Sequence, residues 1–345
     1  MRLSRIIGLT AAVALMGCSD SGATSDDGDT DTDAGGINLD GTTVAEDAED
    51  DNLDSTSSSD GDVLGQLECE RIDFLFVVDN SSSMADEQAH LVAAVPGFVQ
   101  AMQTALPDVK SIRVGVVDTD AYPGLGNPDP LAGACPEEAD CDSCDFTLGA
   151  LATKPNSALD PDLSCDFGTD KPYMDGLAAG FEAEFECAAI VGTEGNPIEQ
   201  QAAALVEAVS TGLNDAGSCN DGFVRDDALL VFLMISDEED DVADQPEPQG
   251  GSLGDPTVWF DAIVQAKGGA AGNVVALGLI GGSPRFDDCN ELSQGLDGAE
   301  QTTRLESFIG NFEHTFTGSV CSEGYDAFFQ DALEQVAEGC RFFIP

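Results

Sequence analysis

Residues 72–84 read Ile72-Asp73-Phe74-Leu75-Phe76-Val77-Val78-Asp79-Asn80-Ser81-Ser82-Ser83-Met84. The first seven are mostly β-branched or aromatic, a composition that favours a strand buried on both faces of a sheet. Asp79, Ser81 and Ser83 follow at once in the pattern D-x-S-x-S. Their oxygens are hard donors of the kind that bind Mg²⁺, Mn²⁺ or Ca²⁺. The segment therefore predicts a cation-binding turn at the end of a buried strand.

Further strand and helix patterns alternate along the chain. Strands are expected at 112–117, 228–235 and 273–280, and helices at 85–106, 176–190, 198–213, 257–267, 302–312 and 325–338. Pro96 is expected to kink or divide the first helix. The alternation predicts an α/β fold, a doubly wound, mainly parallel sheet with helices on both faces. The most hydrophobic strand, 228–235, is expected at its centre.

A second acidic segment follows that central strand. It reads Ser236-Asp237-Glu238-Glu239-Asp240-Asp241. Ligands of parallel sheets bind at the carboxyl ends of strands, so Asp237 is expected beside the D-x-S-x-S turn.

Simpler interpretations of these residues stay open. Ser81 and Ser83 could only cap the next helix, and Asp237 could be a solvated strand end. Asp118 and Asp120 could bind a second cation, although a solvent-facing turn is the simpler interpretation.

The two motifs resemble the von Willebrand factor type A (vWA) domain with its metal-ion-dependent adhesion site. Val77-Val78-Asp79-Asn80-Ser81-x-Ser83-Met84 and Ser236-Asp237-Glu238-x-Asp240 are similar to segments of bacterial vWA lipoproteins, and the resemblance covers residues 70–343. It implies a further ligand from a middle loop, for which we choose Thr193 over Thr169 and Thr211. Thr193 could also be an ordinary loop threonine.

The resemblance implies one divalent cation, Mg²⁺ in the first place and otherwise Mn²⁺ or Ca²⁺. Ser81, Ser83 and Thr193 would bind it directly, and Asp79 and Asp237 largely through water. A Glu or Asp carboxylate of a protein ligand would complete the metal shell.

The expected function is binding of a protein or matrix ligand; the alternative is a structural scaffold of an envelope complex, in which the metal only stabilises the fold. No enzyme activity is expected, since a hydrolase would need a general base, and neither Glu238, Glu239 nor His90 has a visible partner for that role.

The first eighteen residues predict export and lipid anchoring. Arg2 and Arg5 precede an apolar run, 6–15, that is too short to span a bilayer. The run ends in Leu15-Met16-Gly17-Cys18, which looks like the lipobox of bacterial lipoproteins, with Cys18 as the lipidated residue. An ordinary signal peptide is the alternative. Ser19 after the Cys favours the outer membrane of a diderm bacterium, on its periplasmic or surface face.

Composition divides the rest of the chain. Residues 19–66 are Asp-, Ser- and Gly-rich without Lys or Arg, which predicts a disordered tether. Residues 67–345 are expected to form the vWA-like domain, with a Cys-, Pro- and Gly-rich insertion at 118–168.

The remaining cysteines are even in number, which predicts disulfides in an oxidising compartment. They are Cys69, Cys135, Cys141, Cys144, Cys165, Cys187, Cys219, Cys289, Cys321 and Cys340. One expected pair is Cys69 with Cys340, closing the domain. A zinc site of Cys135, Cys141, Cys144 and Cys165 is the alternative.

Charge limits the possible partners. The chain has a formal net charge of −54, with 66 acidic and 12 basic residues. This excludes a broad nucleic-acid surface, which needs clustered Lys and Arg, and direct adhesion to anionic lipid. Membrane contact is therefore expected only through the lipid anchor. His90 and His314 are the only histidines, which excludes multi-histidine metal sites.

Overall fold

The structure is a computed structural model that describes residues 69–119, 143–155, 164–193, 195, 199–240, 251–292 and 298–345. The chain divides into two compact units, residues 1–59 and 60–345, and all described residues belong to the second. The leader with Cys18, the whole tether, Asp120, Cys135 and Cys141 lie outside the described residues.

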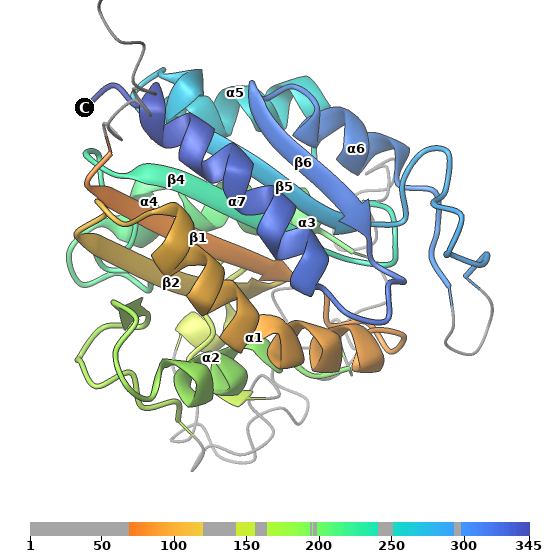
Figure 1. The fold of residues 1–345 in the computed structure, drawn as a ribbon, viewed down its shortest axis with the longest axis horizontal. Coiled ribbons are helices and arrows are strands. Elements are labelled where there is room, and N and C mark those ends of the chain that lie inside the picture. The colour runs from red at the N-terminus through yellow and green to blue at the C-terminus, as the bar shows by residue number, and fades with distance from the viewer. Residues whose placement is uncertain are drawn as a thin grey trace, which may run out of the picture. The chain divides into compact units, whose positions relative to one another are not determined.

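Six strands form one mainly parallel sheet in the order β3-β2-β1-β4-β5-β6 (Figure 1). They are β1 (Arg71–Val78), β2 (Ser111–Asp118), β3 (Met174–Asp175), β4 (Leu229–Ile235), β5 (Val274–Ile280) and β6 (His314–Ser319). Only β3 is antiparallel to its neighbour. The predicted doubly wound α/β fold is confirmed, and β4 lies at the centre beside β1.

Helices cover both faces of the sheet. They are α1 (Ala85–Ala105), α2 (Phe181–Ala189), α3 (Gln201–Ala208), α4 (Thr211–Asn214), α5 (Pro256–Ala266), α6 (Thr303–Ile309) and α7 (Asp326–Arg341), with short 3₁₀ turns η1 (Cys144–Phe146) and η3 (Ala271–Asn273). Helices α1, α2 and α7 share one hydrophobic cluster with the sheet, and α3, α5 and α6 share the other. In Figure 1, α1 and α7 lie in front of the sheet and α3 lies behind it.

Strand β1 shows why its sequence is apolar without a break. Phe74 and Phe76 point into the α1 and α7 layer, where both rings meet Phe98 edge-on. Leu75 and Val77 point into the opposite layer. Successive side chains of a strand alternate between faces, so a strand covered on both sides needs apolar residues at nearly every position.

The structure corrects four details of the expected elements. Pro96 does not divide the helix but lies inside a continuous α1; it removes one backbone donor, while Val95 and Phe98 stay buried and hold the helix on the sheet. The expected helix 198–213 is two helices, because Ser210 starts α4 by accepting a hydrogen bond from the Leu213 amide. Strands β3 and β6 were not expected. The first has two residues, and the second is a half-buried strand of mixed polarity.

Disulfides close the domain and hold the insertion. Cys69 pairs with Cys340, as predicted, and Cys289 pairs with Cys321. Cys144 pairs with Cys219 and Cys165 with Cys187, which joins two described parts of the 118–168 insertion to the rest of the fold. The zinc alternative is wrong, because Cys144 and Cys165 are bonded to cysteines outside the proposed set of four.

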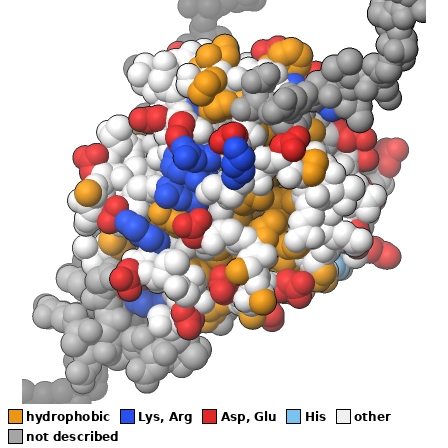
Figure 2. Space-filling view, turned by 60° about the vertical axis from the view of Figure 1, so that its left-hand side comes forward, with side chains coloured by type: hydrophobic (Ala, Val, Ile, Leu, Met, Phe, Trp, Pro, Cys, Tyr) orange, Lys and Arg blue, Asp and Glu red, His pale blue; other side chains and the backbone are white. Residues whose placement is uncertain are grey.

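Basic side chains gather at the end of the sheet where the strands begin (Figure 2). Arg71, the first residue of β1, pairs with Asp227, and Lys110, just before β2, pairs with Glu70. Each of these cations therefore has its own carboxylate on the surface.

Arg225 forms a more buried pair at the same end. Its Nε and backbone N–H donate to the carboxylate of Asp73 at 2.8 and 2.7 Å, and its guanidinium also donates to the Ser111 hydroxyl at 2.7 Å. The Asp73 side chain is fully buried and that of Arg225 is 13% exposed. Burial raises the pKa of Asp73, and the Arg225 charge opposes the rise. The pair ties the starts of β1 and β2 to the loop before β4.

We predict that Arg225→Met destabilises the fold by about 3–5 kcal/mol, because it leaves a buried carboxylate without its cation. Urea unfolding of the full chain measures the change. Arg341→Met is the matched control: Arg341 pairs with Glu338 on the surface, with side chains 40% and 42% exposed, and we expect a loss below about 1 kcal/mol. Equal losses in both variants would contradict this account.

Candidate metal site at the carboxyl end of the sheet

The two predicted motifs meet because β1 and β4 are neighbours in parallel register. Val78 and Ile235, the last residues of the two strands, are paired. The Asp79 amide then donates to the Ile235 carbonyl at 3.0 Å, which continues the pairing by one residue. Asp79 and Ser236 therefore leave the sheet side by side, and Asp237 follows at the same edge.

Asp79 is fully buried and held from both sides. Its Oδ1 accepts from the Ser81 amide at 2.7 Å, and its Oδ2 accepts from the Ser236 hydroxyl at 2.6 Å. Burial raises the pKa of Asp79, and these hydrogen bonds oppose the rise. The carboxylate is thus fixed in orientation.

Ser81 and Ser83 place two hydroxyls next to each other. Their Oγ atoms are 3.2 Å apart, and both residues are buried. Helix α1 has Met84 at its N-cap position, with no side-chain capping hydrogen bond. The helix-cap interpretation is therefore not what the structure shows, and both hydroxyls lie at the strand end beside Asp79.

Asp237 is buried, and neither carboxylate oxygen makes a hydrogen bond of normal geometry within the described residues, although the nearby Ser83 hydroxyl lowers its pKa. Burial, followed by the charge of Asp79, raises the pKa of Asp237 to about 7. A buried carboxylate without a donor is costly to ionise. The alternative of a solvated strand end is wrong, because Asp237 is fully buried.

The donor set fits a hard divalent cation. Two carboxylates and two hydroxyls offer only oxygen, which suits Mg²⁺, Mn²⁺ and Ca²⁺. Within the described ranges, no group of three or more His, Cys, Asp or Glu side chains is placed to hold a metal ion. A cation at this edge would therefore depend on the serine hydroxyls as well as the carboxylates.

The loop with Thr193 lies against the same turn. Gln88, on α1, donates to the carbonyls of Asp79 and Gly192 at 3.0 and 2.7 Å, and its Oε1 accepts from the Gly192 amide. The Gly195 amide donates to the Asn80 carbonyl at 2.9 Å, and a Cβ at Gly195 would lie only 2.7 Å from that oxygen. The loop is thus held close to the motif, whereas Thr193 as a ligand stays a prediction. Of the weaker candidates, Thr211 is the first residue of α4 and Thr169 lines a pocket beside β2.

Side chains that the sequence analysis did not assign to the site hold it in place. Ser236 donates to Asp79 and accepts from the Gln201 amide group at 2.8 Å, which links the site to the start of α3. Thr119, directly after β2, donates to Glu199 Oε2 at 2.5 Å and to Asn80 Oδ1 at 3.2 Å. Ser236 was visible beside Asp237, but its bond to Asp79 depends on the strand order.

Glu87 adds a further buried carboxylate one helical turn after Ser83. Burial is the largest cause that raises the pKa of Glu87 to about 9, and the charges of Asp86 and Asp237 add to it. This end of the sheet therefore holds more buried carboxyl groups than the motifs alone indicate, and Glu87 is protonated at neutral pH in the metal-free protein.

Residues after Asp237 hold its loop rather than face solvent. Asp240 is buried and accepts from the Ala202 amide at 2.8 Å and from the Ser252 hydroxyl at 2.6 Å. Glu239 accepts from the amides of Arg304 and Leu305 in the first turn of α6, at 2.7 and 3.1 Å. These bonds fix the backbone that carries Asp237. They also engage the carboxylate of Glu239, which the sequence analysis considered as a general base.

Comparisons with known proteins give distant structural likenesses only. No protein-family model matches the chain, and no curated protein matches it. Among solved structures it is similar to the pilus adhesin SpaC of Lactobacillus rhamnosus GG (TM-score 0.39, 11% identity) and to a von Willebrand factor type A protein of Catenulispora acidiphila (0.34, 11%). It is also similar to proximal thread matrix protein 1 of the mussel byssus (0.37, 10%).

Each alignment covers 79% of this chain but only 31%, 43% and 50% of those chains, in the same order. The chain thus spans half or less of the length of the structures that it resembles. The fold assignment rests on the strand order and the two helical layers described above.

We predict that Asp237→Asn stabilises the metal-free protein as pH rises. The folded-state pKa of Asp237 is raised from 3.8 to about 7, so its ionisation opposes folding. Wild type therefore loses stability as pH rises between these two values, and the variant, which has no carboxyl group at this position, does not. The advantage of the variant should grow by about 1–3 kcal/mol between pH 5 and pH 7, the cost of an unsatisfied buried group, and then stay constant. Unfolding in chelator at several pH values measures it.

Adding Mg²⁺ at pH 8 supplies the control. Wild type should gain stability from the ion and Asp237→Asn should not. A difference between the two proteins that does not change with pH would show that Asp237 is solvated.

Proposed function

We propose that this chain is a lipid-anchored binding protein that holds a divalent cation, Mg²⁺ in the first place. A carboxylate of a protein partner would complete the coordination shell of this cation. The observation that supports it most is the buried Asp237 carboxylate, which has no cationic partner and no hydrogen bond of normal geometry among the described residues and lies near Asp79 and the Ser83 hydroxyl. A bound cation would supply the missing positive charge.

The geometry suggests which donors would bind the cation directly and which would bind it through water. Asp79 already accepts from Ser81 and Ser236, which suits a carboxylate that orients bound water rather than one that binds the ion with both oxygens. Ser81, Ser83 and Thr193 would then be the direct ligands. These donors are neutral, so the ion would keep its affinity for an external carboxylate. An acidic protein could in this way bind an acidic partner.

The proposed location is the outer membrane of a diderm bacterium, with the chain exported and anchored through lipid on Cys18. The four disulfides among the described residues support an oxidising compartment. No helix in the described ranges is long and apolar enough to cross a bilayer.

A structural scaffold is the second candidate, and one observation favours it. Asp79, Ser81 and Ser83 are 0%, 3% and 7% exposed, so an ion here could be wholly enclosed and serve only the fold. The two functions differ in whether the ion keeps a position open to a partner. An enzyme is not proposed, since Glu239 is engaged at α6.

We predict one saturable cation site that depends on the serine hydroxyls. Calorimetric titration of the chelator-stripped full chain with Mg²⁺, Mn²⁺ and Ca²⁺ should show it above the background of surface carboxylates. Ser81→Ala/Ser83→Ala should lose this site and keep the background, because the variant removes two ligands and no surface charge. Identical heats in the two proteins would count against the proposal.

We predict that Mn²⁺ in the site keeps an exchangeable water that a carboxylate displaces. Water-proton relaxation by protein-bound Mn²⁺ should fall when acetate or a glutamate-containing peptide is added, and Thr193→Ala should weaken this response without moving the unfolding midpoint. Thr257→Ala, on the exposed side of α5, is the matched control. Relaxation that is low and insensitive to carboxylate would favour the scaffold.

A further inference from the structure

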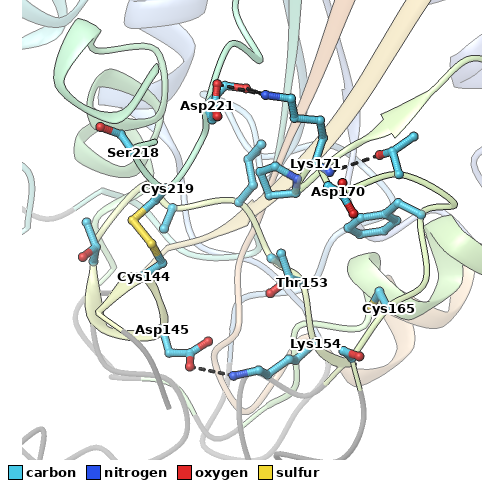
Figure 3. Close-up of a pocket in the computed structure, with 18 of the residues that line it drawn as sticks. Cys144, Asp145, Thr153, Lys154, Cys165, Asp170, Lys171, Ser218, Cys219 and Asp221 are labelled. Atoms are coloured by element: carbon cyan, nitrogen blue, oxygen red, sulfur yellow. Dashed lines mark hydrogen bonds and ion pairs between the residues drawn. A yellow bond between two sulfur atoms is a disulfide. The ribbon is translucent and has the colours of Figure 1, made fainter. Parts of the chain in front are cut away.

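A second cavity lies beside the carboxyl end of β2, where Asp118 is part of its lining (Figure 3). Its volume is about 480 Å³, which is within the range of small-molecule sites. One wall is formed by η1 and residues 217–221, and the other by residues 151–154 and 164–172. The second wall extends the sheet, since the Ala152 amide donates to the Val116 carbonyl of β2 at 2.7 Å.

Covalent bonds and one buried side chain fix both walls. Cys144–Cys219 joins the two segments of the first wall, and Cys165–Cys187 ties the second wall to α2. Asn220 is fully buried between the walls: its side chain accepts from the Leu151 amide at 2.9 Å and donates to the Gly149 carbonyl at 2.8 Å. The cavity is therefore pre-formed, which lowers the entropy cost of binding.

Two ion pairs cross the cavity from wall to wall. Lys154 contacts Asp145 at 2.6 Å and Lys171 contacts Asp221 at 2.9 Å, and Figure 3 shows each lysine reaching an aspartate of the opposite wall. The first pair is nearly enclosed, with side chains 16% and 11% exposed. Breaking such a pair leaves a poorly solvated charge behind, which is unfavourable.

Two hydroxyl groups of the cavity lining are not used by the described part of the chain. Thr153 and Ser218 both line the cavity. Neither hydroxyl makes a hydrogen bond to another described residue, although each is partly buried. Phe167 and Pro172 add an apolar area to the same lining. The cavity thus offers hydrogen-bond donors, acceptors and a small apolar surface.

We propose that this cavity binds a neutral polyhydroxylated ligand, a mono- or oligosaccharide. Sugar hydroxyls both donate and accept, so they can bond to the aspartate and lysine groups while both ion pairs stay intact. The C–H face of a sugar ring would lie on the apolar area. An anionic group would instead have to displace Asp145 or Asp221 from its lysine, and it would also meet Asp118, Asp166 and Asp170 in the lining. The site has no residue in common with the candidate metal site.

Saturation-transfer NMR on the full chain, in a detergent without sugar, tests the proposal. The probes are glucose, galactose, mannose, N-acetylglucosamine, maltose and cellobiose, with glucuronate and glycylglycine as charged comparators. At least one neutral sugar should bind saturably and unchanged in chelator. Thr153→Val and Ser218→Ala should each weaken it by about three- to tenfold, the effect of one hydrogen bond.

Thr257→Val is the matched control, since it makes the same substitution on an exposed helix face and should leave binding unchanged. Unfolding midpoints of all variants should match wild type, which separates lost contacts from lost folding. The proposal is overturned if no neutral sugar binds, if binding ignores both cavity substitutions, or if glycylglycine binds instead and loses affinity in Thr153→Val. Because chelator leaves the cavity intact, failure here is distinguishable from failure of the metal site.

Discussion

The parallel pairing of β1 with β4 is the constraint on which the candidate metal site depends. Val78 and Ile235 are partners, and the Asp79 amide and Ser236 hydroxyl extend the contact beyond the strands. A shift of one residue in this register would turn every β1 side chain to the other face of the sheet, and Asp79 would no longer face Ser236. The apolar packing on both faces therefore also sets the geometry of the polar groups at the strand ends.

This arrangement gathers carboxyl groups where water is scarce, so their ionised forms are disfavoured until a cation is present. Asp79, Asp237 and Glu87 are all buried at one end of the sheet, and burial raises the pKa of each. At the opposite end the buried Asp73 has Arg225. The fold thus compensates one buried carboxylate with its own arginine, while at the carboxyl end Asp237 has neither an arginine nor a hydrogen bond of normal geometry in the described structure. That difference is the physical reason for proposing a cation there.

Local patterns were sufficient for β1, β4 and the D-x-S-x-S turn, because a continuous apolar run followed by hard donors is readable in a short window. The surrounding contacts were not readable in this way. Gln88, Ser236 and Thr119 reach partners that are distant in sequence, so their roles depend on which strands are neighbours. Strand β6 was missed because its outer position permits mixed polarity. The number of cysteines indicated disulfides, but three of the four pairings among the described residues could be assigned only from the three-dimensional fold.

The bond between Cys69 and Cys340 has a mechanical consequence. It joins Cys69, two residues before β1, to the last turn of α7, so tension on the chain ahead of Cys69 is divided between a central strand and a helix. Beyond that point the load runs along β1, which is paired in parallel with β2 and β4 over its length. Pulling along such a strand shears many hydrogen bonds together instead of opening them one by one. Strand β1 is the shortest covalent path from Cys69 to Asp79, and its pairing on both sides therefore also makes it the part of the chain that best resists extension.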